Sequence, residues 1–178
     1  MGQDDTKHNL LFISKYPEII HEFTDAMKDR DIEIDTAING IEAAAKIKKK
    51  NYDIVITGLS LEGFNGEQII TYLNKTAPST VCIIYTTTIS SAQLHFFINE
   101  RNVFRVFLRP VDFRGAFWEA LEEAYEYHAV QVKNEEDTGA RRQEQEKQER
   151  SRRMNAVAEQ VRCEALAAFE GNEDEVLL

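Results

Sequence analysis

A glycine, Gly58, ends the apolar stretch Ile54–Thr57, at a position where a functional side chain is expected. The stretch is typical of a buried strand, and the residues after it turn through Gly63 and Gly66 into helical spacing. Open α/β sheets bind ligands beyond the carboxyl ends of their strands. Gly58 contributes no side chain there, so either a functional group has been lost or the turn requires a glycine.

Polar and charged residues follow the other strand-like stretches. These residues are Ser14 and Lys15 after residues 10–13, Thr86 and Thr87 after residues 81–85, and Arg109 after residues 104–108. A magnesium site in a protein needs carboxylate oxygens from its side chains. The set offers none, so it predicts no metal, no cofactor and no catalytic residue. Lys15, Thr86 and Arg109 could instead bind an anion.

The elements that must position these residues alternate along the chain. We expect strands at 10–13, 32–38, 54–57, 81–85 and 104–108, each followed by apolar residues at helical spacing, such as Leu94, Phe97 and Ile98. Five strands alternating with five helices predict a doubly wound α/β fold, a flavodoxin-like parallel sheet of order 2-1-3-4-5. The alternating pattern of 32–38 places that strand at an edge. This order brings the polar set and Gly58 to one crevice.

Composition limits the functional classes. The chain has 178 residues, 43% of them hydrophobic, and a net charge of −10, which argues against broad binding to nucleic acid or anionic membranes. The two cysteines, Cys82 and Cys163, lack metal-ligand spacing and fit a reducing compartment. No signal peptide or long apolar run is present, so we expect a cytoplasmic protein.

The pattern divides the chain into three parts. We expect a disordered N-terminus at 1–8, a globular domain at 9–130, and a charged linker and amphipathic C-terminal helix at 131–178. The charged residues 133–153 could be a linker or a solvated helix, with a turn signal at 137–139. Met154, Val157, Val161, Ala165 and Phe169 form a narrow apolar stripe on that helix. The stripe could pack on its own domain, fray in solution, or associate with a second copy or a partner.

Five segments, in order, resemble the response-regulator receiver domain, which accepts a phosphoryl group from a histidine kinase. They are "LFISKYPEI", "AINGIEAAAKI", "YDIVITGLSLEGFNGEQII", "CIIYTT" and "VFLRPVD", and they cover roughly residues 8 to 130. The resemblance implies the doubly wound fold already expected from the pattern, and a role in two-component, phosphorelay signalling.

The departures from the family fall on its chemistry. The resemblance places the metal-binding acidic pair at Ser14 and Lys15, the phosphorylated aspartate at Gly58, the hydroxyl at Thr86 and the lysine at Arg109. Only Thr86 is kept. Elsewhere, Asp53 lies at the start of its strand and is no substitute acceptor, Glu62 replaces a loop proline, and Val106 replaces an aromatic switch residue.

These departures predict a pseudo-receiver, a phosphorylation-independent module that binds protein partners or a second copy of itself. The expected interaction residues are His95, Phe96, Val106, Val157, Val161 and Phe169. A second hypothesis is a small-ligand sensor with an anion or phosphorylated metabolite at Lys15, Thr86 and Arg109. The simplest interpretation of Lys15 and Arg109 is solvated or Glu62-paired cations. No nucleophile–base pair indicates an enzyme, because the histidines are scattered along the chain.

Overall fold

The computed structural model describes residues 7–171, with side chains as far as residue 168. The strands are β1 (His8–Ile13), β2 (Ile32–Ala37), β3 (Ile54–Thr57), β4 (Val81–Thr86) and β5 (Val103–Leu108). The helices are α1 (Pro17–Met27), α2 (Gly40–Lys49), α3 (Gly66–Thr76), α4 (Ser91–Glu100) and α5 (Ala116–Gly171). All strand pairs are parallel and the order is β2-β1-β3-β4-β5, which confirms the predicted fold class and the edge position of β2.

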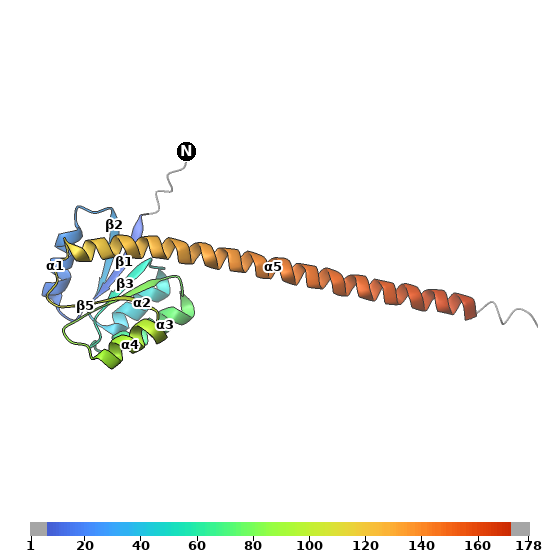
Figure 1. The fold of residues 1–178 in the computed structure, drawn as a ribbon, viewed down its shortest axis with the longest axis horizontal. Coiled ribbons are helices and arrows are strands. Elements are labelled where there is room, and N and C mark those ends of the chain that lie inside the picture. The colour runs from blue at the N-terminus through green and yellow to red at the C-terminus, as the bar shows by residue number, and fades with distance from the viewer. Residues whose placement is uncertain (1–6, 172–178) are drawn as a thin grey trace, which may run out of the picture. The chain divides into compact units, whose positions relative to one another are not determined.

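Helices cover both faces of the sheet (Figure 1). On one face, α1 and the first turns of α5 pack Phe23 and Phe117 against Phe12 and its neighbours in β1, β3 and β4. On the other face, α2, α3 and α4 contribute a second apolar cluster that includes Ile70 and Phe97. The central strands are therefore buried on both sides, as their continuous apolar sequence predicts.

Side-chain caps fix where three helices begin. The Asn39 side chain accepts a hydrogen bond from the backbone of α2, and the Asn65–Gln68 and Ser90–Gln93 pairs form capping boxes at α3 and α4. Pro17 occupies the first turn of α1, where its missing N–H costs nothing. Each cap follows a loop beyond a strand's carboxyl end, so the caps also fix the loops that border the crevice.

Of the two interpretations of residues 133–153, a linker or a solvated helix, the structure has the helix. Residues 131–153 are helical and belong to α5, with no turn at 137–139. Glu, Gln, Lys and Arg are good helix formers, and ion pairs of i,i+4 spacing, such as Arg142–Glu146 at 3.4 Å, support them. Gly139 is tolerated at a cost of about 1 kcal/mol. The chain divides into two compact units at Val132 and Lys133.

One further expectation needs correction. The predicted disordered stretch 1–8 reaches too far, because His8 pairs with Ile32 in the sheet; residues 1–6 lie outside the described part.

The helix predicted from the spacing of Leu94, Phe97 and Ile98 is confirmed as α4. Phe97 and Phe96 pack against the second apolar cluster, whereas Leu94 and Ile98 are 37% and 46% exposed.

Candidate functional site

The predicted crevice residues come together in the structure. Ser14, Lys15, Gly58, Thr86 and Arg109 all line one small hollow of about 60 Å³ at the carboxyl ends of β1, β3, β4 and β5. Tyr16, Leu59, Ser60, Leu61, Tyr85 and Thr87 complete its lining. Sequence order alone was enough to locate this site, because the parallel sheet brings all four strand ends to one edge.

Backbone hydrogen bonds continue beyond the strands and hold the crevice residues in register. The Gly58 N–H donates to the Ile13 carbonyl at 3.1 Å, and the Arg109 N–H donates to the Thr86 carbonyl at 2.8 Å. The Ser14 N–H bonds in the same way to Ala37, at 3.0 Å. The site therefore stands on the ends of the sheet itself, and its backbone positions are well fixed.

Gly58 is not required by space at its own position. A Cβ built there would come no closer than 3.8 Å to the Leu61 side chain and the Tyr85 carbonyl, which is ordinary contact. A Cβ at Gly66, in contrast, would meet the Gly58 carbonyl at 2.2 Å. The close turn therefore needs Gly66, whereas steric contacts do not require a glycine at position 58.

Aromatic rings hold the cations of the crevice. The Arg109 guanidinium lies 4.5 Å from the centre of the Tyr16 ring and 5.8 Å from that of Tyr85. The Lys15 ammonium lies 5.3 Å from the Tyr16 ring. The nearby Arg109 guanidinium and, after it, the charge of Lys15 lower the pKa of the Tyr16 hydroxyl. Two cations and a tyrosine thus lie together in the crevice, and the tyrosine ring contacts both cations.

Sequence reasoning missed Tyr16, although an aromatic residue directly after the Ser14–Lys15 pair was a readable signal. The sequence analysis also allowed an ion pair of Lys15 or Arg109 with Glu62. Among the described residues no such ion pair is observed. The backbone of Glu62 instead accepts a hydrogen bond from the Gly40 N–H at 2.9 Å. The cations are therefore held by stacking on aromatic rings rather than by a carboxylate.

The lining of the crevice does not fit a divalent cation. Its side chains are hydroxyls, cations and apolar groups, and none of its lining residues is Asp or Glu. The Ser14 Oγ accepts from the Tyr16 N–H at 3.2 Å, and the Thr86 Oγ1 donates to the Thr88 carbonyl at 3.3 Å, so both hydroxyls serve the local loops. Within residues 7–171 no cluster of three or more His, Cys, Asp or Glu side chains could hold a metal ion.

Asp53 lies at the start of β3, at the opposite end of the sheet from the crevice, as expected. Its carboxylate accepts from the Asn9 N–H at 3.2 Å and lies 3.2 Å from His128 Nε2 and 3.4 Å from His8 Nδ1. Burial alone would raise the pKa of the Asp53 carboxyl, but the hydrogen bonds from His128 and Asn9 outweigh it and hold that pKa below its usual value. Two histidines that look scattered in sequence therefore meet at one carboxylate.

The predicted interaction residues have different environments. His95 on α4 is exposed, whereas Phe96 and Val106 are half-buried against the second apolar cluster. Val157 and Val161 on α5 are exposed, and the side chain of Phe169 lies outside the described residues. Leu94 and Ile98, which were not among the predicted interaction residues, also present apolar surface on α4.

A comparison with models of protein families identifies one family. The sequence model of the response regulator receiver domain matches residues 11–115. No curated protein is similar enough in sequence to count as a relative. Within the described residues, no helix is long and apolar enough to cross a membrane.

Solved structures share the fold at low sequence identity. The signal receiver domain of an HD domain-containing protein from Pseudomonas fluorescens Pf-5 is 19% identical, with 70% of this chain and 98% of that chain covered and a TM-score of 0.65. A CheY-like receiver domain protein from Methanospirillum hungatei JF-1 is 18% identical, with 70% and 99% covered and a TM-score of 0.64. An adenylate cyclase from Rhodopirellula baltica is 19% identical, with 73% and 96% covered and a TM-score of 0.67.

Proposed function

Because the chain belongs to the response regulator receiver domain family of two-component signalling, we propose that it acts there as a non-enzymatic module that works without being phosphorylated. The Arg109 guanidinium stacked on Tyr16, in a crevice without a lining carboxylate, carries this proposal. Phosphoryl transfer by the family's chemistry needs an in-line carboxylate and a metal that neutralises the developing charge. Neither can be assembled from the residues that line the crevice.

The proposed output is protein–protein contact through α4, β5 and the part of α5 before Val132. On α4, His95 is exposed and Leu94 and Ile98 add apolar surface beside it. Exposed apolar side chains that share one face are typical of protein interaction sites. Arg109 and Tyr16 line the crevice where a phosphoryl group would act, so this face is proposed to stay in one conformational state. The strength of the signal would then depend on how much partner is present and not on phosphorylation.

The second unit is proposed to contribute a homodimer contact. In that unit Met154, Val157 and Val161 recur every three or four residues and are well exposed in the single chain. A solitary helix with so narrow a stripe gains little stability from its own sequence. Association of two such helices would remove the stripe from water, with the surrounding charged residues forming pairs between chains.

The anion-sensing alternative has weaker support. A volume of about 60 Å³ is far below the roughly 300–1,000 Å³ of typical small-molecule sites. Nucleotides and most phosphorylated metabolites therefore exceed the space between Lys15, Thr86 and Arg109.

The proposed location is the cytoplasm, because the receiver family acts in phosphorelay signalling.

Intact-mass spectrometry after incubation with acetyl phosphate and magnesium tests the proposal. The mass should stay unchanged for the wild-type chain and for Gly58→Asp, because an aspartate alone lacks a metal site. The triple variant Ser14→Asp/Lys15→Asp/Gly58→Asp should recover a base-labile phosphoryl group, since Gly58 has room for a side chain. A stoichiometric phosphoryl group on the wild-type chain would show the proposal to be wrong.

A further inference from the structure

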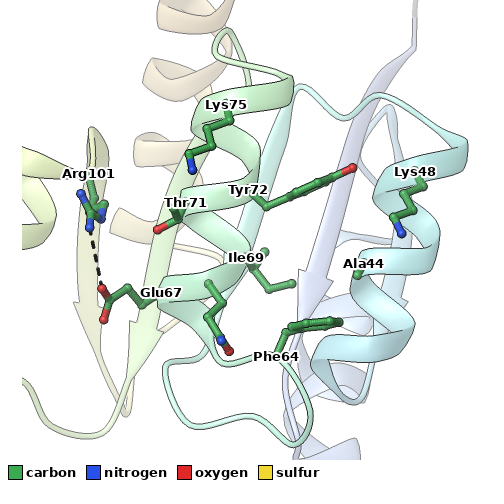
Figure 2. A pocket seen from close by; sticks show the side chains of 10 residues that line it. Ala44, Lys48, Phe64, Glu67, Ile69, Thr71, Tyr72, Lys75 and Arg101 are labelled. Carbon is green, nitrogen blue, oxygen red and sulfur yellow. Dashed lines mark ion pairs between the residues drawn. The ribbon is translucent and has the colours of Figure 1, made fainter.

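A second hollow, of about 540 Å³, lies on the helical face formed by α2, α3 and the end of α4 (Figure 2). It shares no lining residue with the crevice, and its volume is within the range of binding sites in proteins. Neither the family's chemistry nor the proposed contact through α4, β5 and α5 uses it. The chemistry of its lining indicates what kind of molecule it would bind.

The centre of the hollow is aromatic. Phe64, from the loop before α3, and Tyr72, from α3, both extend on the side of α3 that faces Ala44 of α2 (Figure 2). Phe64 is 47% exposed, which is unusual for a phenylalanine in a structured loop. Tyr72 is half-buried and packs against the second apolar cluster. The two rings line the same hollow, are partly open to water and offer apolar surface on this side of α3.

The backbone around Phe64 is held tightly, so its exposure is a fixed feature. The Gly40 N–H donates to the Glu62 carbonyl, and a Cβ at Gly40 would come within 1.8 Å of the Phe64 carbonyl oxygen. Gly63 has a φ of +78°, which favours glycine. An aromatic side chain has few rotatable bonds, and on a fixed backbone it loses little conformational entropy on binding.

Cations surround this apolar centre. Lys48 comes from α2, Lys75 from α3 and Arg101 from the end of α4. Lys48 and Lys75 form no ion pair among the described residues. Arg101 lies 4.0 Å from Glu67, the only acidic residue of the lining, at the limit of an ion pair. A positive rim on a chain with a net charge of −10 is a local feature that selects acidic ligands.

From this surface we infer that the hollow docks an acidic, amphipathic peptide segment of a partner protein. An aliphatic or aromatic side chain of the peptide packs on Phe64 and Tyr72, and its carboxylates face Lys48 and Lys75. The two parts have different roles: apolar packing supplies affinity, and the rim charges supply orientation and speed of association. The inference does not depend on whether the crevice can be phosphorylated.

Selection from a phage-displayed library of random amphipathic peptides against the full chain tests the inference. Enriched peptides should combine Glu or Asp with Leu, Phe or Trp. The double variant Lys48→Glu/Lys75→Glu should weaken the best peptide at least about tenfold, and Phe64→Ala should do the same. Lys49→Glu is the matched charge control, because Lys49 is an exposed neighbour on α2 outside the lining.

A second control, Leu94→Ala, removes exposed apolar surface from α4, and peptide binding should not change. Thermal unfolding of each variant verifies that the fold is kept. We expect it to be kept because substitutions at exposed positions usually cost little stability. If Phe64→Ala unfolds the chain, the charge-reversed variant still decides the question. The inference is overturned if no peptide is enriched, if enriched peptides are basic, if Lys49→Glu weakens binding as much as the double variant, or if Leu94→Ala alone abolishes it. A dimer that dissociates on Phe64→Ala would make a second copy the occupant, and would overturn it too.

Discussion

Replacing Asp53 with asparagine should destabilise the receiver domain without touching the crevice. The Asp53 side chain is only 24% exposed, and its carboxylate is held by the Asn9 N–H and by His128. His128 also places Nδ1 2.8 Å from the Ser79 carbonyl, so this ring links the fifth helix to two other elements. Asparagine keeps the size of the side chain but removes its charge and half of its acceptors.

Asp53→Asn should lower the free energy of unfolding by about 2–3 kcal/mol. A hydrogen bond to a charged, mostly buried group contributes about 1.5–3 kcal/mol, and the exposed His8 contact adds little. Urea unfolding followed by the fluorescence of Trp118, the chain's single tryptophan, measures it. With a slope of about 1–3 kcal/mol per molar urea, the midpoint should fall by roughly 0.7–3 M. Asp31→Asn is the control, because Asp31 is 91% exposed and its substitution should cost less than about 0.5 kcal/mol.

The stabilisation by Asp53 should decrease in acid. Because the pKa of Asp53 is lowered in the folded chain, its stabilisation is complete above the unfolded value of about 3.9 and is lost as the pH falls through the folded value. The difference between the wild type and Asp53→Asn should therefore persist from pH 7 to pH 5 and shrink below about pH 4. Equal stability of the two chains at pH 7, or a gap that does not narrow in acid, would refute the reasoning.

Three other predictions concern the tail, the crevice and its turn. Val161→Asp places a charge in the apolar stripe and should convert a dimer to a monomer in sedimentation; if a chain ending at Lys133 has the same oligomeric mass as the full chain, the tail is not the dimer contact. Added phosphate or nucleotides should leave the melting temperature flat, and a rise that Lys15→Ala removes would favour the anion sensor instead. Gly66→Ala should lower the melting temperature by several degrees because its Cβ would meet the Gly58 carbonyl at 2.2 Å, whereas Gly58→Ala should be nearly neutral.

The sequence predicted the sheet order and the crevice because both follow from rules that act along the chain. Strand periodicity, right-handed crossovers and the ends of parallel strands place Ser14, Gly58 and Arg109 together without knowledge of any contact. The family resemblance then indicated which groups were missing. These steps needed only residue type and order.

Features that depend on three-dimensional packing were not predictable in the same way. The stacking of Arg109 on Tyr16 depends on side-chain directions, which sequence spacing does not give. The meeting of His128 with Asp53 joins residues far apart in the chain. On α4, Leu94 and Ile98 fit the same helical spacing as Phe97, but only Phe97 is fully buried, together with the half-buried Phe96. Spacing alone did not indicate which of these residues would be exposed.

The measurement that tests phosphorylation independence most directly is a two-dimensional amide NMR titration with magnesium and beryllofluoride. Beryllofluoride binds to an aspartate in the presence of magnesium and mimics a phosphoryl group, so it requires the groups that Gly58 and the Ser14–Lys15 pair no longer supply. The account predicts that the amide signals of Gly58, Thr86 and Arg109 keep their positions throughout the titration. Saturable shifts of these signals, with a one-to-one stoichiometry, would contradict it.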